Sequence, residues 1–276
     1  MWGWEKINER APIWTRSPSD ITDDEYDAFY TSLKKVEGKP MSHIHFKVEG
    51  DATFTSLIYI PDTPPLGMFE MRVRDDPLKL YVKRVFISDK FVTEVIPKWL
   101  NFIVGIIDSD ELPLNVGREM LQQHKTLEVI KKKVIRKVIA HFQEMAKDEP
   151  EKYDAFYNLY HNNVKLGVIE DVHNKVRLSK LIKFASYNHP DQLIFLDQYV
   201  KEMKEGQKEI YFVGGEGKES LIKSSMIEGI VKRGYDVLLL TDPIDEYVIQ
   251  VLQKFDSYKL VDSSKESVRL TEDEEA

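Results

Sequence analysis

A regular alternation of short apolar segments and amphipathic segments late in the chain constrains the fold more than any other feature. The segments read as strand 209–213, helix 218–233, strand 236–240, helix 242–255 and strand 259–261. Strands joined by helices of this length form a parallel sheet with right-handed crossovers, and the helices cover both of its faces. Residues 193–264, which start with a further helix at 196–204, therefore predict a small α/β unit with αβα layers and a βαβαβ sheet.

The first 150 residues predict a larger α/β unit, also layered as helix, sheet and helix. Acidic residues followed by aromatic residues at helical spacing indicate an amphipathic helix, and alternation of polar and apolar residues around Glu49-Gly50-Asp51 is typical of a hairpin. The expected elements are a helix at 20–34, a hairpin at 43–60, one strand at 80–87, and helices at 92–100 and 120–145. The unit is expected to span residues 1–150.

The segment between these units reads as a short helical connector, residues 151–192. Aromatic and leucine spacing from Tyr153 to Phe184 predicts two or three short helices with a break at Gly167. An Asn188-His189-Pro190 turn is expected to end them. Residues 265–276 are rich in acidic side chains and are expected to form an acidic tail.

Composition narrows the possible partners of the chain. The net charge of −8 and the pI near 5.5 argue against a general nucleic-acid surface or an anionic-membrane surface, because both require an excess of lysine and arginine. No apolar run approaches the length of a membrane span, so no membrane partner is expected. The sequence contains no cysteine, which excludes disulfides, thiolate catalysis and cysteine-ligated zinc.

The stretch Leu112–Gln123 places an arginine and two glutamines where a polar loop runs into a long helix. Helix N-termini carry partial positive charge, so an arginine in the first turn is disfavoured by roughly 0.3–1 kcal/mol against an acid. A guanidinium beside free backbone N–H groups is, however, a good receptor for phosphate oxygens. Arg118 is therefore a candidate phosphate-binding residue; the alternative is that it pairs with a nearby carboxylate such as Glu119 or Asp110.

Other possible sites have weaker signals. The Gly214–Ser220 turn follows a strand and opens a helix, but its spacing does not match a Walker loop, and its glycines are expected to serve a tight turn. His43 and His45 share one face of a strand, yet no third ligand is evident, so no metal is expected. No Gly-x-Ser-x-Gly elbow is present either. We expect no catalytic activity from this chain by itself.

The loop at 112–123 resembles the catalytic loop in the middle segment of the ninety-kilodalton heat-shock chaperones, the Hsp90 family. Ile13–Arg16, Lys79–Ile87 and Asp242–Tyr247 are similar to further signatures of that family, in the same order. The chain is thus identified as a middle segment. Three stretches are most similar to endoplasmin, the branch in the lumen of the endoplasmic reticulum, and this implies that compartment, with the cytoplasm as the alternative. These stretches are Gln122–Lys125, Lys165–Asp171 and Leu196–Tyr199.

The resemblance implies an ATPase site split between domains. ATP with Mg²⁺ would be bound mainly by an N-terminal domain that the sequence given does not include, and Arg118 would reach the γ-phosphate. Gln122, one helical turn further on, would serve the same loop, and Asn115 would shape its turn. The family usually has serine before the arginine, whereas this chain has Gly117, so a looser loop is expected.

The resemblance also implies the partners. These are client proteins, co-chaperones, and the N-terminal ATP-binding and C-terminal dimerisation domains of a longer parent chain, from which this monomeric piece is expected to be excised. Phe86 matches a residue that packs against the N-terminal domain, although a place in the strand core is the alternative. Trp14 matches a tryptophan associated with client or co-chaperone contact, again with the core as the alternative. Two other functions remain open: a non-catalytic scaffolding module, and a free-standing nucleotide enzyme that uses the C-terminal sheet.

Overall fold

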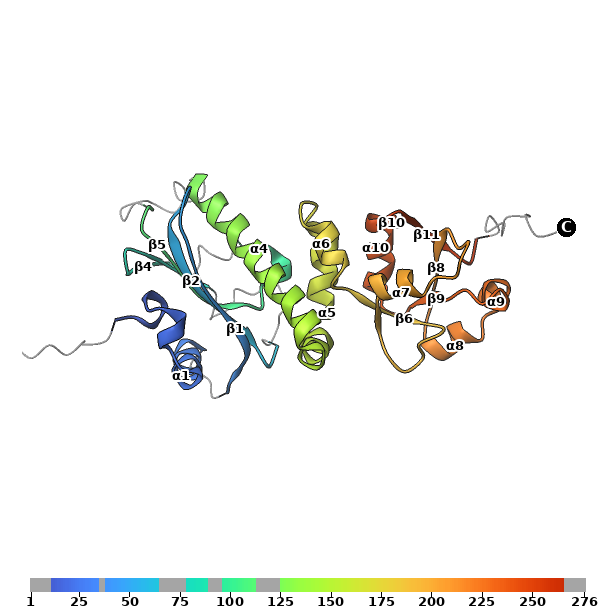
Figure 1. Ribbon diagram of the computed structural model, residues 1–276, viewed down its shortest axis with the longest axis horizontal. Coiled ribbons are helices and arrows are strands. Elements are labelled where there is room, and N and C mark those ends of the chain that lie inside the picture. Colours follow the sequence, from blue (N-terminus) through green and yellow to red (C-terminus); the bar gives the residue numbers. More distant parts are fainter. Residues whose placement is uncertain (1–10, 35–37, 65–77, 89–95, 113–124, 266–276) are drawn as a thin grey trace, which may run out of the picture. The chain divides into compact units, whose positions relative to one another are not determined.

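A computed structural model describes residues 11–34, 38–64, 78–88, 96–112 and 125–265 (Figure 1). The chain forms two compact units, Met1–Tyr160 and His161–Ala276. Each unit contains its own sheet with helices against it, which confirms the predicted α/β class. Among the described residues, no helix has the length and apolar character needed to cross a membrane.

The first unit is built on a five-stranded sheet in the order β1-β2-β5-β3-β4. The strands are β1 (Pro40–Val48), β2 (Phe54–Pro61), β3 (Lys79–Val82), β4 (Val85–Ser88) and β5 (Val104–Ser109). The predicted hairpin is confirmed as the antiparallel pair β1–β2. All pairs are antiparallel except β3–β5, which is parallel.

Helices cover both faces of this sheet. On one face, α1 (Asp23–Lys34) and the short 3₁₀ helices η1 (Ile13–Thr15) and η2 (Pro18–Asp20) bury a core that includes Tyr30 and Tyr59. On the other, α4 (Lys125–Asp148) approaches β1, where Ser42 is hydrogen-bonded to His141. The chain enters β5 through a third 3₁₀ helix, η3 (Lys98–Leu100). The layered αβα arrangement of the larger unit is therefore present.

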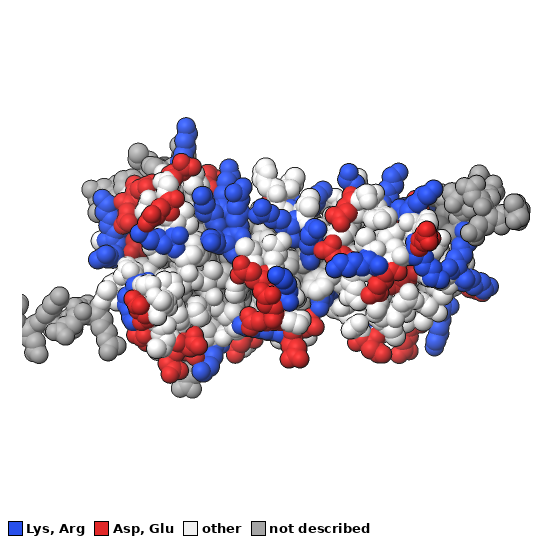
Figure 2. Space-filling view, viewed as in Figure 1, with Lys and Arg blue, Asp and Glu red and all other residues white. Residues whose placement is uncertain are grey.

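The amphipathic character of α4 explains its position. Its apolar residues recur at helical spacing and are buried; they include Leu127, Ile130, Val134, Val138 and Phe142. Lys132, Arg136 and Lys137 are on the outer side and are exposed. Figure 2 shows the basic side chains gathered in the region where α4 lies, with acidic side chains nearby. Burial of the apolar stripe, rather than helix propensity, accounts for most of the stability of such a helix.

One prediction in this unit was wrong, and one strand was missed. The single strand expected at 80–87 is two strands, because Lys83 and Arg84 form a tight turn with positive φ angles of 50° and 67°. The central strand β5 was not predicted at all. It contains Gly105, at which any side chain would collide with the backbone carbonyl of Leu57 on β2. The helix expected at 92–100 falls partly outside the described residues, and its described end contains only η3.

The second unit contains a six-stranded sheet in the order β10-β11-β8-β9-β6-β7. The three predicted strands are confirmed as β8 (Glu209–Gly214), β9 (Val237–Leu240) and β11 (Tyr258–Asp262), and they are parallel. Three short strands that were not predicted extend the sheet in antiparallel fashion. They are β6 (Lys183–Ser186), β7 (Ile194–Phe195) and β10 (Lys254–Phe255).

Helices in the second unit lie where right-handed crossovers require them. Apolar residues of α8 (Lys218–Ile222) and α9 (Ser225–Lys232) pack against Tyr211, Val213 and Leu239 on one face of the sheet. The next crossover helix, α10 (Pro243–Leu252), returns the chain across β8 to β11 and so covers the opposite face. A further helix, α7 (Leu196–Glu202), agrees with the predicted position of the first helix of this unit.

Three expected helices have other boundaries in the structure. The one expected at 242–255 ends at Leu252, because Lys254 and Phe255 form β10. The single helix expected at 218–233 is interrupted because Ser224 caps a second helix, its hydroxyl accepting a hydrogen bond from the backbone N–H of Met226. The expected break at Gly167 is absent, since α5 (Pro150–Glu170) runs through it, followed by α6 (Lys175–Ser179). The predicted connector 151–192 thus contains α5 and α6 together with β6, which belongs to the second sheet.

Candidate functional site

The predicted catalytic residues Asn115, Arg118 and Gln122 lie outside the described residues, but the strand that leads to them is described. β5 ends at Ser109, and the backbone N–H of Asp110 donates to the carbonyl of Thr53 at 3.2 Å. The backbone N–H of Thr53 in turn donates to the carboxylate of Glu111 at 3.0 Å. The chain is therefore held against the start of β2 just before the predicted loop.

Trp14 is a core residue of the first unit. Only 9% of the residue is exposed, and its indole N–H donates to Asp108 Oδ2 at 2.8 Å. Its ring also lies 5.1 Å from Tyr81 and 5.8 Å from Phe29, measured between centroids. Of the two interpretations of this tryptophan, the core position is the one that the structure displays, while contact with clients or co-chaperones stays a prediction.

Phe86 is in the opposite situation. It lies on β4, the edge strand of the sheet, and half of its surface is exposed, as is that of its neighbour Val85. The ring of Tyr81 makes an edge contact with it at 5.6 Å between centroids. Large apolar side chains that remain exposed together at a sheet edge are typical of contact surfaces. The exposed part of the Phe86 side chain can therefore contact a partner protein or domain.

Asp108, which the sequence analysis did not identify, joins Trp14 to the turn that precedes Phe86. Its carboxylate accepts the indole N–H of Trp14 through Oδ2 and the backbone N–H of Arg84 through Oδ1, the latter at 3.1 Å. The residue is 7% exposed. A lone acidic residue at the end of an apolar run, Ile106-Ile107-Asp108, was the available signal, because a charge inside such a strand must have specific partners.

The two histidines considered as metal ligands have other roles. His45 is hydrogen-bonded through Nδ1 to the hydroxyl of Tyr26 at 2.8 Å and through Nε2 to the carbonyl of Trp14 at 3.1 Å. The ring of His43 stacks on Tyr26 with 3.9 Å between centroids. Burial lowers the pKa of both imidazoles, so they are neutral near pH 7. They help to attach α1 to the sheet.

In the second unit, the motif at the start of α10 has a structural role. Asp242 and Asp245 form a capping box, and both carboxylates are paired with the ammonium of Lys165, at 2.9 and 2.6 Å. Lys165 and Asp245 are buried. Burial raises the pKa of Asp245, whereas Lys165 lowers the pKa of Asp242 against the opposing effect of its partial burial. This cluster attaches α5 to α10.

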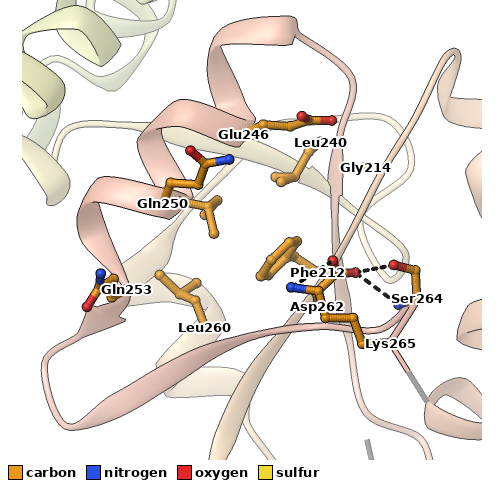
Figure 3. A pocket seen from close by; sticks show the side chains of 11 residues that line it. Phe212, Gly214, Leu240, Glu246, Gln250, Gln253, Leu260, Asp262, Ser264 and Lys265 are labelled. Atoms are coloured by element: carbon orange, nitrogen blue, oxygen red, sulfur yellow. Dashed lines mark hydrogen bonds and ion pairs between the residues drawn. The ribbon is translucent and has the colours of Figure 1, made fainter. Parts of the chain in front are cut away.

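A groove of about 530 Å³ lies at the carboxyl ends of β8, β9 and β11, beside α10 (Figure 3). Its apolar floor includes Phe212 and Leu260, and carboxylates of Glu246 and Asp262 line it. Crevices at this end of a parallel sheet commonly bind ligands. Lys265 also lines the groove and lies 3.9 Å from Asp262, so the charged lining residues are two carboxylates and one ammonium, a net negative charge that disfavours phosphate.

The Hsp90 protein family model matches residues 1–276, the whole chain. The chain belongs to the Hsp90 family. The fold agrees: the middle domain of a putative heat shock protein of Plasmodium falciparum superposes with a TM-score of 0.82 at 35% identity, covering 92% of this chain and all of that one. The chain is therefore the middle domain of an Hsp90 chaperone, as the sequence predicted.

Curated relatives identify the branch of the Hsp90 family that the chain resembles. Endoplasmin homologs of Dictyostelium discoideum and Caenorhabditis elegans are 46% and 44% identical over all of this chain. An endoplasmin homolog of Arabidopsis thaliana is 41% identical over 99% of it. The chain spans 36% of the length of each of these relatives. The predicted similarity to endoplasmin is confirmed.

Proposed function

We propose that this Hsp90 middle domain supplies Arg118 to the γ-phosphate of ATP that a separate N-terminal domain binds with Mg²⁺. One observation carries the proposal: an Hsp90 chain places Leu-Pro-Leu-Asn and Arg-Glu-Met-Leu-Gln-Gln between a buried central strand and a long helix. Hydrogen bonds with Thr53, the residue before β2, hold the chain just before that loop. A rigid base supports a loop that must deliver a charged group accurately.

The chemical roles within the loop follow from charge and geometry. The guanidinium of Arg118 would stabilise charge on the transferring phosphoryl oxygens, a contribution worth roughly 10³–10⁵ in rate for arginines supplied from outside other nucleotide pockets. Mg²⁺ bound with ATP would neutralise charge on the same phosphates. Gln122 would face the ligand beside Arg118, and Asn115 would shape the turn before them. We expect a smaller effect here because Gly117 adds backbone freedom.

Client and partner binding is the second part of the proposal. The exposed pair Val85 and Phe86 would contact the N-terminal domain or another partner, and Trp14 would contribute from beneath this surface. Similarity to endoplasmin homologs supports residence in the lumen of the endoplasmic reticulum. Dimerisation would depend on a C-terminal domain, so this chain by itself would be monomeric.

A scaffolding module that binds clients without assisting hydrolysis is the alternative. Gly117 supports it, because a glycine in place of serine removes a hydroxyl that could cap the following helix. If the loop works but is loose, Gly117→Ser in the full-length protein should raise ATP turnover. Unchanged turnover would favour the scaffolding function.

Steady-state ATPase activity of the full-length protein with Arg118→Ala tests the main proposal. We expect turnover to fall by at least about tenfold with unchanged ATP affinity, because the side chain acts on charge that develops in the transition state. Arg136→Ala, on the exposed side of α4, is the matched control and should leave turnover unchanged. Equal turnover in the Arg118 variant and the unaltered protein would contradict the catalytic role.

A further inference from the structure

The groove at the carboxyl ends of β8, β9 and β11 has an apolar floor and a polar rim (Figure 3). The apolar part consists of Phe212, Leu240, Ile249 and Leu260. Its volume of about 530 Å³ falls within the roughly 300–1,000 Å³ of small-molecule sites, which are mostly apolar with a few polar groups that orient the ligand. The groove therefore has the size and the surface of a site for a small ligand.

One wall of the groove is a single face of α10. Glu246, Gln250 and Gln253 are spaced four and three residues apart, so their side chains lie on the same side of the helix and its end. In the parts of the chain that the structure describes, these three side chains have no hydrogen bond or ion pair to other protein groups. One carboxylate and two amides are consequently available to a ligand along this wall.

The backbone of Gln253 adopts a conformation that favours glycine. This residue caps the end of α10 with a φ angle of 56°. Its N–H donates to the carbonyl of Ile249 at 2.9 Å, and its carbonyl accepts the N–H of Leu260 at 3.0 Å. Glycine is the usual residue at such a position, because a side chain makes positive φ angles costly. A side chain that lines the groove is thus present where the backbone alone would favour its absence.

The uncompensated negative charge of the groove is the carboxylate of Glu246. Asp262 Oδ1 accepts the backbone N–H and the hydroxyl of Ser264 at 2.9 and 2.7 Å, and Oδ2 lies 3.9 Å from the ammonium of Lys265. Glu246 instead lies against Gly214, where an added Cβ atom would be 3.2 Å from Oε1. A carboxylate without a protein cation, placed beside apolar surface, can form charge-assisted hydrogen bonds with an ammonium or guanidinium group.

We propose that the groove binds a small organic cation, an amine or guanidine attached to an aromatic or branched aliphatic body. The cationic group pairs with Glu246, and the amide oxygen of Gln250, one turn further along α10, is a second acceptor. The body of the ligand packs on the apolar floor, where the ring of Phe212 adds an aromatic or cation–π contact. Neither ATP nor the arginine loop takes part, so this binding is independent of the proposed function.

Isothermal titration calorimetry of the 276-residue chain with phenethylamine tests the proposal. Two compounds of similar shape isolate the contribution of charge: 2-phenylethanol is neutral, and 3-phenylpropionate is an anion. We expect a dissociation constant of about 0.1–1 mM for phenethylamine, a modest affinity for a ligand of this size. The alcohol should bind at least about tenfold more weakly, and the anion should not bind measurably, because only the amine can pair with a carboxylate.

Glu246→Gln removes the charge with little change in shape. It should weaken phenethylamine at least about tenfold and leave the weak binding of the alcohol unchanged. Glu228→Gln is the matched control, since it makes the same charge change at an exposed carboxylate of α9, which packs on the other face of the sheet. It should leave the binding of all three compounds unchanged. Both variants should keep the urea midpoint of the unaltered chain.

Gln253→Gly separates a role in binding from a role in folding. Glycine adopts a positive φ angle at lower cost, so the urea midpoint should stay the same or rise. Binding of phenethylamine should nevertheless weaken about threefold, because the groove loses a polar side chain from its wall. Unchanged binding in this variant would remove Gln253 from the site and overturn the assigned wall.

Four results would overturn the proposal as a whole. Two are the absence of phenethylamine binding and binding that Glu246→Gln leaves unchanged. Equal affinities for the amine and the alcohol would show an apolar site without charge selection. An arginine- and leucine-containing peptide that binds more than about tenfold tighter than phenethylamine would assign the groove to a protein partner instead.

Discussion

At the scale of single residues, the buried charges of this Hsp90 domain are its most informative positions. Asp108 binds two N–H groups without an ion pair in the described structure, whereas Lys165 is paired with two carboxylates. Both arrangements depend on complete pairing, because a buried charge that loses its partner leaves an uncompensated desolvation cost. Neither position is explained by packing alone.

Lys165→Met should destabilise the second unit by about 3–5 kcal/mol near pH 7, the usual cost of removing one partner from a buried ion pair. Urea unfolding of the variant and of the unaltered chain measures this difference in the free energy of unfolding. Lys180→Met is the control: its ammonium is 3.7 Å from Asp197, both side chains are about 40% exposed, and its loss should cost less than about 1 kcal/mol. Equal effects of the two substitutions would contradict the assigned role of Lys165.

Lys165→Met should also change how the free energy of unfolding depends on pH. Burial already raises the pKa of Asp245, and loss of Lys165 removes the main group that opposes this rise. The native state would then bind a proton more tightly than the unfolded chain, so stability should increase as the pH falls through the raised pKa toward the ordinary carboxyl range. A destabilisation that stays constant from about pH 7.5 down to that range would show that the pair contributes nothing electrostatic.

At the scale of elements, the sequence predicted regular pieces well and irregular ones poorly. The parallel strands β8, β9 and β11 were found because each is an apolar run between helical patterns. The β3–β4 turn was missed because Lys83 and Arg84 are not typical turn residues. Hydrogen bonds from their backbone N–H groups to β5 stabilise the positive φ angles that glycine or asparagine would adopt more easily. For the same reason, Asp108 could not be assigned a role before its two partners were seen.

The hairpin turn yields a prediction at this scale. Replacing Lys83 and Arg84 by Asn and Gly should stabilise the first unit by about 1 kcal/mol, because these residues adopt positive φ angles at lower cost. The backbone N–H that donates to Asp108 is retained. Urea unfolding should show a higher midpoint with an unchanged slope. A matched exchange at Lys131 and Lys132, inside α4, should instead lower the midpoint. A lower midpoint for the turn variant would mean that its side chains stabilise the fold.

At the scale of the whole molecule, the middle domain divides its tasks between two units. The first contains the strand before the arginine loop and the exposed Phe86; the second contains a mixed sheet with three parallel strands and with helices on both faces. The sequence predicted the αβα layers of both units and the family. It could not predict the boundary at residue 160, because α5 continues through it without a break in helical periodicity.

This division predicts that the 276-residue chain by itself binds ATP with a dissociation constant in the millimolar range or not at all. The groove of the second unit has the topology of a nucleotide site, but the carboxylates of Glu246 and Asp262 outnumber the ammonium of Lys265 in its lining, and the net negative charge would oppose a polyphosphate. Isothermal titration calorimetry with MgATP on this chain and on the full-length protein measures the difference. We expect affinity tighter than millimolar only in the full-length protein, as is typical of enzyme substrates. Glu246→Gln removes the negative charge beside Gly214. We expect that even this variant of the chain does not bind ATP tightly. Micromolar binding to the chain alone, weakened by changes in the groove, would instead favour a nucleotide enzyme built on the second sheet.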